Sequence, residues 1–222
     1  MTLTVRTLSR PLAVAAGAVV LSGVLSACAP LVVGTAMGTS VLVATDRRTS
    51  GTQLEDQGIE LRAANRLRDQ FGDRARVSVT SYNRRVLLTG EVPSEADRAT
   101  ANRIVAGVEN VREIVDELGV MSSPSFTARS ADTLVTARVK AALVDARDVS
   151  ANAFKVVTER GTTYLMGRVT QREADRATEV ARSIPGVQRV VRVFELISEE
   201  ELARITPAPA QPAAPAGNTT GR

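Results

Sequence analysis

The chain contains two copies of one sequence module. The hexapeptide Glu95-Ala-Asp-Arg-Ala-Thr100 recurs unchanged as Glu173-Ala-Asp-Arg-Ala-Thr178. Further matches flank it on both sides, pairing Val86–Val92 with Thr163–Val169 and Gly107–Val111 with Gly186–Val190. The offset of about 78 residues is the size of a small domain rather than of a solenoid repeat. Features that both copies share therefore indicate scaffold, and a feature that only one copy has is a candidate functional site.

The N-terminus has the pattern of an export signal. Arg6 and Arg10 precede an apolar stretch, Pro11–Val24, which is too short for a stable membrane span. Leu25-Ser-Ala-Cys28 then has the form of a bacterial lipobox and contains the only cysteine. We expect residues 1–27 to be a lipoprotein signal peptide and Cys28 to be lipidated, so no disulfide is expected. A secretory leader with an incidental cysteine and a short signal anchor are the alternatives.

Composition argues against several classes of function. The net charge is +4, and it falls to +2 (26 basic against 24 acidic residues) once Arg6 and Arg10 leave with the leader. This small excess, with only 3% aromatic residues, gives no indication of nucleic-acid binding. The chain has no histidine, and we find no glycine-rich phosphate loop or metal-binding motif. We therefore expect a protein that is not an enzyme and that uses no cofactor or metal.

Residues 54–120 are expected to form the first module, after a lipidated N-terminus and flexible tether over residues 28–53. Asp56 is predicted to cap a helix whose apolar positions recur every four residues, and Ser94 to open a second helix that Gly107 ends. The predicted strands are Val77–Tyr82, Arg85–Gly90 and Val111–Val120, the first two joined by a turn at Asn83-Arg84.

Residues 121–130 are predicted to be a linker, and residues 131–198 to repeat the same order. The expected elements are helices Asp132–Ala146 and Arg172–Ser183, with strands Phe154–Glu159, Thr163–Val169 and Val187–Ile197. Residues 199–222 are predicted to be an acidic turn and a disordered Pro/Ala-rich tail. The fold class is thus α+β, with two tandem α-β-β-α-β modules, each a small three-stranded sheet with two helices. Modules this small bury too little surface to be very stable alone, so we expect them to pack together.

Short shared motifs carry a resemblance to a known family. Val86-Leu-Leu-Thr-Gly90 and Leu165-Met-Gly167 in the second strands, with Gly107-Val and Gly186-Val after the second helices, resemble the BON domain. Together with the lipobox, the tether and Asp46-Arg-Arg-Thr-Ser-Gly-Thr52, the two copies resemble the DolP-like family of dual BON-domain outer-membrane lipoproteins. The resemblance covers residues 28–196.

This resemblance implies a function. It implies a protein without catalysis that binds anionic phospholipids such as phosphatidylglycerol and cardiolipin, supports outer-membrane integrity and acts at division sites. Ala29, rather than Asp, follows Cys28, and by resemblance to enteric lipoprotein sorting this implies anchoring in the inner leaflet of the outer membrane, facing the periplasm. The first helix of the second copy is implied to carry the lipid contact, with Leu134 at a position where the family has Trp.

The residues of this helix fall on two faces of different character. Val135, Val139, Ala142 and Leu143 form an apolar stripe that should pack on the module's own sheet. The predicted phospholipid-binding face consists of Leu134, Ala137, Arg138, Lys140 and Ala141. Leu134 aligns with Gly58, so the exposed anchor is expected to be absent from the first copy.

Other readings remain open. Leu134 would equally suit packing against the other module or a loop, and Arg138 and Lys140 an ordinary solvated surface. The main alternative function is a protein-interaction platform or accessory subunit for an envelope assembly or cell-wall machine, with envelope proteins as partners. A periplasmic stress-protective role is a third. The remaining charges, including Arg66, Arg68, Arg74 and Arg76, are expected to be solvated, and the shared Asp-Arg pairs of the hexapeptides to pair on the helix surface.

Overall fold

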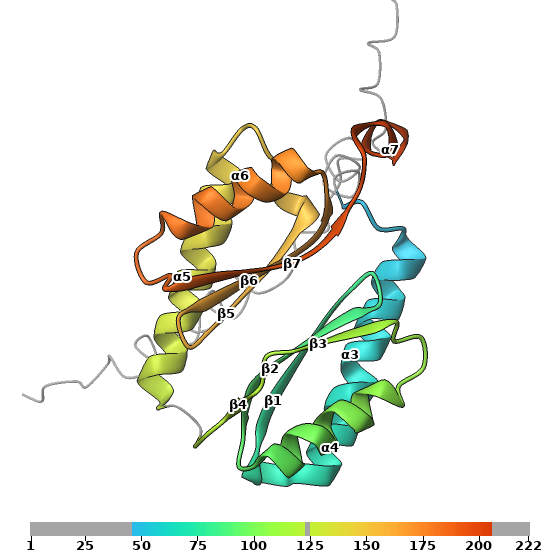
Figure 1. The fold of residues 1–222 in the computed structure, drawn as a ribbon, viewed down its shortest axis with the longest axis vertical. Coiled ribbons are helices and arrows are strands. Elements are labelled where there is room, and N and C mark those ends of the chain that lie inside the picture. Colours follow the sequence, from blue (N-terminus) through green and yellow to red (C-terminus); the bar gives the residue numbers. More distant parts are fainter. Residues whose placement is uncertain (1–45, 123–124, 206–222) are drawn as a thin grey trace, which may run out of the picture. The chain divides into compact units, whose positions relative to one another are not determined.

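The computed structural model describes residues 46–122 and 125–205. The first module (Figure 1) contains α3 (Ser50–Phe71), a 3-10 turn (Gly72–Arg74), β1 (Arg76–Tyr82), β2 (Arg85–Val92), α4 (Glu95–Ala106), β3 (Glu113–Asp116) and β4 (Gly119–Val120). The second contains α5 (Phe126–Asp145), a 3-10 turn (Ala151–Ala153), β5 (Phe154–Glu159), β6 (Thr162–Val169), α6 (Gln171–Arg182) and β7 (Arg189–Leu196), followed by α7 (Glu199–Ile205). The predicted α-β-β-α-β order is confirmed in both copies.

The two sheets share one topology. In each, the first two strands pair antiparallel and the third pairs parallel to the second, giving the orders β1-β2-β3 and β5-β6-β7. Val111–Val120 is predicted to be one strand, but in the structure the third strand of the first module is interrupted between β3 and β4. The Asp116 carboxylate accepts the Leu118 N–H at 3.0 Å, Leu118 turns into the core, and pairing with β2 resumes only at β4.

Both first helices begin earlier than predicted. α3 begins at Ser50 and α5 at Phe126, each after a Thr or Ser residue whose hydroxyl accepts a backbone N–H of the first turn. The helices therefore extend into the segments 28–53 and 121–130 that were predicted to be tether and linker. Asp56 and Asp132 are not helix caps, and their carboxylates have another role.

Asp56 holds the hairpin between β1 and β2. It is 1% exposed and accepts the backbone N–H groups of Asn83 and Arg84, each at 2.8 Å, and the Ser81 hydroxyl at 2.7 Å. Asn83 and Arg84 both have positive φ, the backbone of a tight two-residue turn. The Asp56 carboxylate, which comes from α3, accepts hydrogen bonds from the two backbone N–H groups of this turn. These N–H groups would otherwise be left without a partner.

The second module uses the same device. Asp132 accepts the backbone N–H groups of Arg160 and Gly161 at 2.8 and 3.0 Å, and both turn residues have positive φ. The shared aspartate is therefore scaffold, as the repeat argument predicts for features present in both copies.

Each module has its own apolar core. Figure 1 shows the two helices of each module on one face of its sheet, and the core lies between them. Ile59, Ala63, Leu67 and Phe71 of α3, the predicted apolar positions, are at most 4% exposed. Val135, Val139 and Leu143 of α5 are likewise buried against β5 and β6, with Ala142 partly buried beside them. Both cores lie inside residues 46–205.

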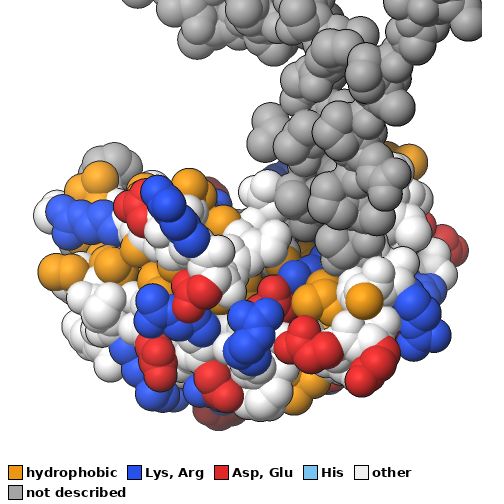
Figure 2. Space-filling view, turned by 90° about the horizontal axis from the view of Figure 1, so that it is seen from above, with side chains coloured by type: hydrophobic (Ala, Val, Ile, Leu, Met, Phe, Trp, Pro, Cys, Tyr) orange, Lys and Arg blue, Asp and Glu red, His pale blue; other side chains and the backbone are white. Residues whose placement is uncertain are grey.

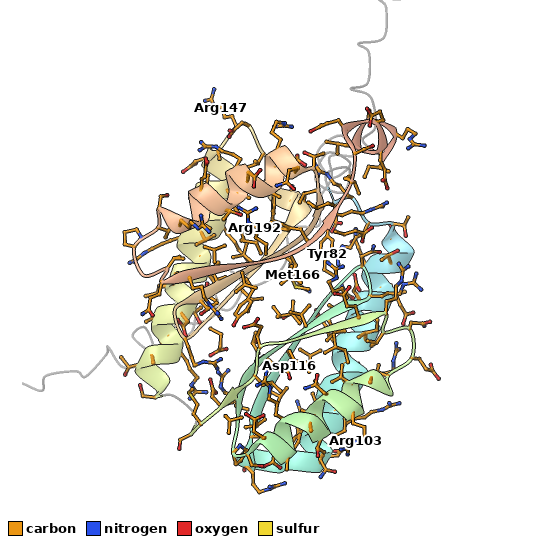
Figure 3. The ribbon with its side chains drawn as sticks, viewed as in Figure 1. Tyr82, Arg103, Asp116, Arg147, Met166 and Arg192 are labelled. Atoms are coloured by element: carbon orange, nitrogen blue, oxygen red, sulfur yellow. The ribbon has the colours of Figure 1, made fainter. Side chains whose placement is uncertain are left out.

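The other faces of the sheets pack on each other, as expected for modules this small. Tyr82 and Leu87 of the first module form an apolar cluster with Tyr164, Met166 and Val193 of the second. Tyr82 and Met166 lie between the sheets in Figure 3. Burial raises the pKa of Tyr82 to about 12, so its hydroxyl stays protonated and donates to the Ala153 carbonyl at 3.3 Å.

Ion pairs complete this contact. Glu91, 1% exposed, pairs with Arg76 of its own module at 3.0 Å and with Arg160 of the other at 2.7 Å. Arg76 also pairs with Glu159, and Lys155 pairs with Glu60 at 2.6 Å across the same contact. The prediction that Arg76 is merely solvated is therefore wrong, because its partners come from strands that are distant in sequence.

The duplicated hexapeptides lie in the N-terminal halves of α4 and α6, and their side chains bond differently from the prediction. Arg98 of α4 pairs with Asp116 of β3, and Asp175 of α6 pairs with Arg192 of β7, each at 2.8 Å. These pairs join a helix to the third strand, whereas the prediction had them within the helix surface. In the first module the helix carries the basic partner and the strand the acidic one, and in the second module the roles are reversed, so the attraction is preserved.

Gly90 and Gly167 mark a close approach between strands. A Cβ on Gly90, whose φ is +111°, would lie 2.0 Å from the Arg76 carbonyl oxygen. A Cβ on Gly167 would lie 2.6 Å from the Ala153 carbonyl oxygen. A side chain would therefore be costly at both glycines, which explains why both copies of the motif have glycine here.

Candidate functional site

The outer face of α5 is the candidate site. The helix buries Val135, Val139 and Leu143, so the side chains on its opposite side are directed away from the core. All five predicted site residues are exposed, namely Leu134, Ala137, Arg138, Lys140 and Ala141. Leu134 is 59% exposed, which excludes its burial within the described part of either module.

Val144 extends this apolar surface and was not among the site residues predicted from the sequence. It is 68% exposed and lies one turn after Lys140 and Ala141. The spacing of Ala137, Ala141 and Val144 by four and three residues would have identified it, because such positions share a helix face. We call Leu134, Ala137, Arg138, Lys140, Ala141 and Val144 the outer α5 face.

The charge on this face is positive. Neither Arg138 nor Lys140 forms an ion pair within residues 46–122 and 125–205. The acidic Asp132 of the same helix is occupied by the hairpin turn, which leaves Asp145 as the exposed carboxylate of α5. Elsewhere basic and acidic side chains are interspersed, as Figure 2 shows for one face of the molecule.

The first module differs at the matching helix. Arg62, which aligns with Arg138, pairs with Glu55 at 2.6 Å and lies beside Gly58. The expectation that this helix lacks exposed apolar anchors is wrong, because Leu54 and Leu61 are 70% and 64% exposed on α3. They lie four residues before and three residues after Gly58, on the same helix face. At the matching position the two helices therefore differ in charge pairing, because Arg62 of α3 is paired with Glu55 whereas Arg138 of α5 has no ion-pair partner among the described residues.

Two hollows border the outer α5 face. One, of about 480 Å³, is lined by Arg129, Ser130, Thr133 and Leu134. The other, of about 440 Å³, lies beside Lys140 and Val144 and is also lined by Asp46, Arg48 and Tyr82 of the first module. The chain thus enters its described part next to the C-terminal half of α5.

Cys28, the predicted lipidation site, lies outside the described residues, as do the predicted leader and most of the predicted tether and tail. Within the described part, every helix is too short or too polar to cross a membrane. That same part contains no group of three or more Asp, Glu, His or Cys side chains suited to a metal ion.

Comparison with known proteins identifies the modules. The BON domain model matches residues 56–121 and 131–197. The chain is 39% identical over 176 residues to the outer membrane lipoprotein DolP of Haemophilus influenzae, covering 78% of this chain and 90% of that protein. It is 35% identical over 154 residues to the 21 kDa hemolysin of Actinobacillus pleuropneumoniae, covering 68% of this chain and 79% of that protein.

A third similarity covers less of both proteins. The chain is 32% identical over 117 residues to the osmotically-inducible protein Y of Escherichia coli, covering 51% of this chain and 58% of that protein. The two matched BON regions and the extent of the match to DolP agree with the duplicated fold described above. The chain therefore belongs to the BON-domain family, as a dual-BON lipoprotein similar to DolP.

Proposed function

We propose that this lipoprotein is anchored through Cys28 in the inner leaflet of the outer membrane and binds anionic phospholipid through the outer α5 face, thereby supporting outer-membrane integrity, including at division sites. The observation that carries this proposal is the combination on one helix face of exposed Leu134 and Val144 with Arg138 and Lys140. Apolar side chains beside cations suit the boundary between acyl chains and anionic headgroups.

The expected affinity of this face alone is modest. Fully burying Leu134 or Val144 contributes at most about 1.5–3 kcal/mol each. Arg138 and Lys140 each contribute about 1 kcal/mol near an anionic surface. A lipid anchor raises the effective concentration of the face at the membrane, so that weak binding becomes sufficient. The position of Asp46 beside Lys140 and Val144 supports this coupling, because the tether then arrives next to the proposed contact.

The role is proposed to be binding rather than catalysis. The relatives carry the names of lipoproteins, a hemolysin and an osmotically induced protein, and none is named as an enzyme. The sole cysteine is assigned to lipidation and the chain has no histidine, so no cofactor, metal or nucleophile enters the proposed activity.

Neutralising both cations should weaken binding to anionic vesicles about thirtyfold. The double variant Arg138→Gln/Lys140→Gln removes two contributions of about 1 kcal/mol each. A form beginning at Thr45 retains both cores and can be titrated with phosphatidylglycerol or cardiolipin vesicles in a flotation assay. Neutral phosphatidylcholine vesicles should bind the parent and the double variant equally weakly.

The matched control is Arg103→Gln/Arg112→Gln, which removes two exposed arginines of the first module. Arg103 lies on the outer surface of α4 in Figure 3, away from α5. Equal losses in the two double variants would show that net charge, and not the outer α5 face, determines binding.

A protein partner is the second candidate, and the exposed Leu54 and Leu61 of α3 favour it. Exposed apolar side chains on one helix face are the kind of surface that a partner protein covers. Photocrosslinking in cells from Leu61 and, separately, from Leu134 distinguishes the two functions. A protein adduct from Leu134 favours an interaction platform or accessory subunit at α5, whereas lipid adducts there favour the first proposal.

A further inference from the structure

The segment Asp46–Thr49, which precedes α3, places two neighbouring arginines on different modules. The Arg47 guanidinium forms two hydrogen bonds of 2.7 Å with the Glu173 carboxylate and donates to the Arg168 carbonyl at 2.9 Å. The Arg47 and Glu173 side chains are only 8% and 4% exposed. A residue from before the first module thus fills a polar site in the second.

Arg48 binds the first module instead. Its guanidinium pairs with Asp56 and Asp46 at 2.8 Å each and lies 4.2 Å from the centre of the Tyr82 ring. A guanidinium over an aromatic face adds a cation–π attraction. Burial lowers the pKa of Arg48, but hydrogen bonds to Asp46 and Asp56 raise it above the ordinary value, so the side chain remains a cation.

The repeat shows that the Arg47 site is specific to the second module. Glu95, the counterpart of Glu173 in the duplicated hexapeptide, has a side chain that is 75% exposed, and its salt bridge to Arg98 is 3.9 Å long. Glu173 in contrast is held on its other side by the Thr170 backbone N–H at 3.1 Å. Burial raises the pKa of Glu173, but the bonds from Arg47 and Thr170 hold it below the ordinary value, so it stays ionised.

We infer that Asp46, Arg47 and Arg48 form a clasp that attaches the end of the membrane tether to both BON domains and fixes its exit beside α5. The exit lies beside α5 because Asp46 and Arg48 line the same hollow as Lys140 and Val144. Without the clasp the tether would be joined only to the start of α3. With it, a pull from the membrane anchor acts on the second module directly.

One consequence rests on the proposed function, namely that the clasp keeps the outer α5 face directed toward the anchored membrane. The clasp itself is independent of lipid. Its existence is therefore tested without lipid, so that an error in the proposed function cannot produce or conceal the result.

The test measures the distance from the tether end to the second module. Removing residues 1–28 leaves a chain without cysteine, into which Thr45→Cys and Arg182→Cys introduce two sites for spin labels. Pulsed electron paramagnetic resonance should give a narrow distance distribution for this parent. Arg47→Ala should broaden it severalfold in width, and Arg47→Lys, which keeps a cation that can donate to the Glu173 carboxylate, should give an intermediate width. A folded Arg47→Ala form with the parent's narrow distribution would overturn the inference.

The control is Arg176→Ala, which removes an ion pair with Asp148 whose partners are 43% and 53% exposed. This variant should leave the distribution unchanged. If Arg47→Ala does not fold, Arg47→Met, which keeps the length of the side chain but none of its hydrogen bonds, takes its place. A folded Arg47→Met form with the parent's narrow distribution would contradict the clasp.

Discussion

The Asp56→Ala variant should lose about 4 kcal/mol of stability, enough to unfold much of the first module. Removing one partner of a buried charged network leaves the others desolvated and unpaired, at a cost of about 3–5 kcal/mol. Asp56 is 1% exposed and bonds Ser81, the two hairpin N–H groups and Arg48. The Ser81 hydroxyl and the two hairpin N–H groups would lose this acceptor, and Arg48 would keep only Asp46. Water cannot replace a carboxylate in a site this closed.

The second module supplies the matched control. Asp132 is partly exposed and accepts two backbone N–H groups, which solvent can reach after the change. We expect Asp132→Ala to cost about 1–2 kcal/mol. Urea unfolding followed by NMR signals of each module measures both losses. Equal losses at the two positions would refute the assignment of Asp56 as the central acceptor of the first module.

The Gly90→Ala variant should lose about 3 kcal/mol or more. Its Cβ would lie 2.0 Å from the Arg76 carbonyl oxygen, a backbone atom that can move only if β1 moves. The φ of +111° is in addition a conformation that L-residues rarely adopt, with a cost of about 1–3 kcal/mol. The first effect separates β1 from β2 where Gly90 pairs with Val77, and the second strains the backbone of β2 at the same residue.

Gly107→Ala is the control for this change. Its φ is −83°, and a Cβ there would be no closer than 3.5 Å to the nearest neighbouring atom. The expected change in the free energy of unfolding is within about 1 kcal/mol and can be stabilising, since alanine reduces the entropy of the unfolded chain. Thermal or urea unfolding of the two variants tests the difference. Comparable losses would mean that the strand approach at Gly90 tolerates a side chain.

Local periodicity predicted the element order because each core helix repeats its apolar residues every four positions. The starts of the helices could not be predicted in the same way. Asp56 resembles a helix cap when only its neighbours in the sequence are considered, but its carboxylate accepts hydrogen bonds from Ser81, Asn83 and Arg84. The role of a carboxylate in a hairpin 25 residues away depends on tertiary packing, which a local pattern does not contain.

The candidate site likewise has features that a local sequence pattern predicts and features that depend on tertiary packing. The exposure of Leu134 followed from its place outside the stripe of Val135, Val139 and Leu143. The exposed Leu61 of α3 does not align with Leu134, whose counterpart is Gly58, and it becomes evident only when the residues one turn away are included. The contact of Arg47 with Glu173 spans 126 positions of sequence and had no local signal beyond the Asp46-Arg-Arg motif.

The central claim is that α5, and not α3, meets an anionic membrane. The chain contains no tryptophan, so Leu134→Trp and Leu61→Trp each introduce one fluorophore at an exposed position of the corresponding helix. With phosphatidylglycerol vesicles carrying brominated acyl chains, the emission of Trp at position 134 should shift to the blue and be quenched, and that at position 61 should not. Neutral vesicles should affect neither. Quenching at position 61 with none at position 134 would contradict the account.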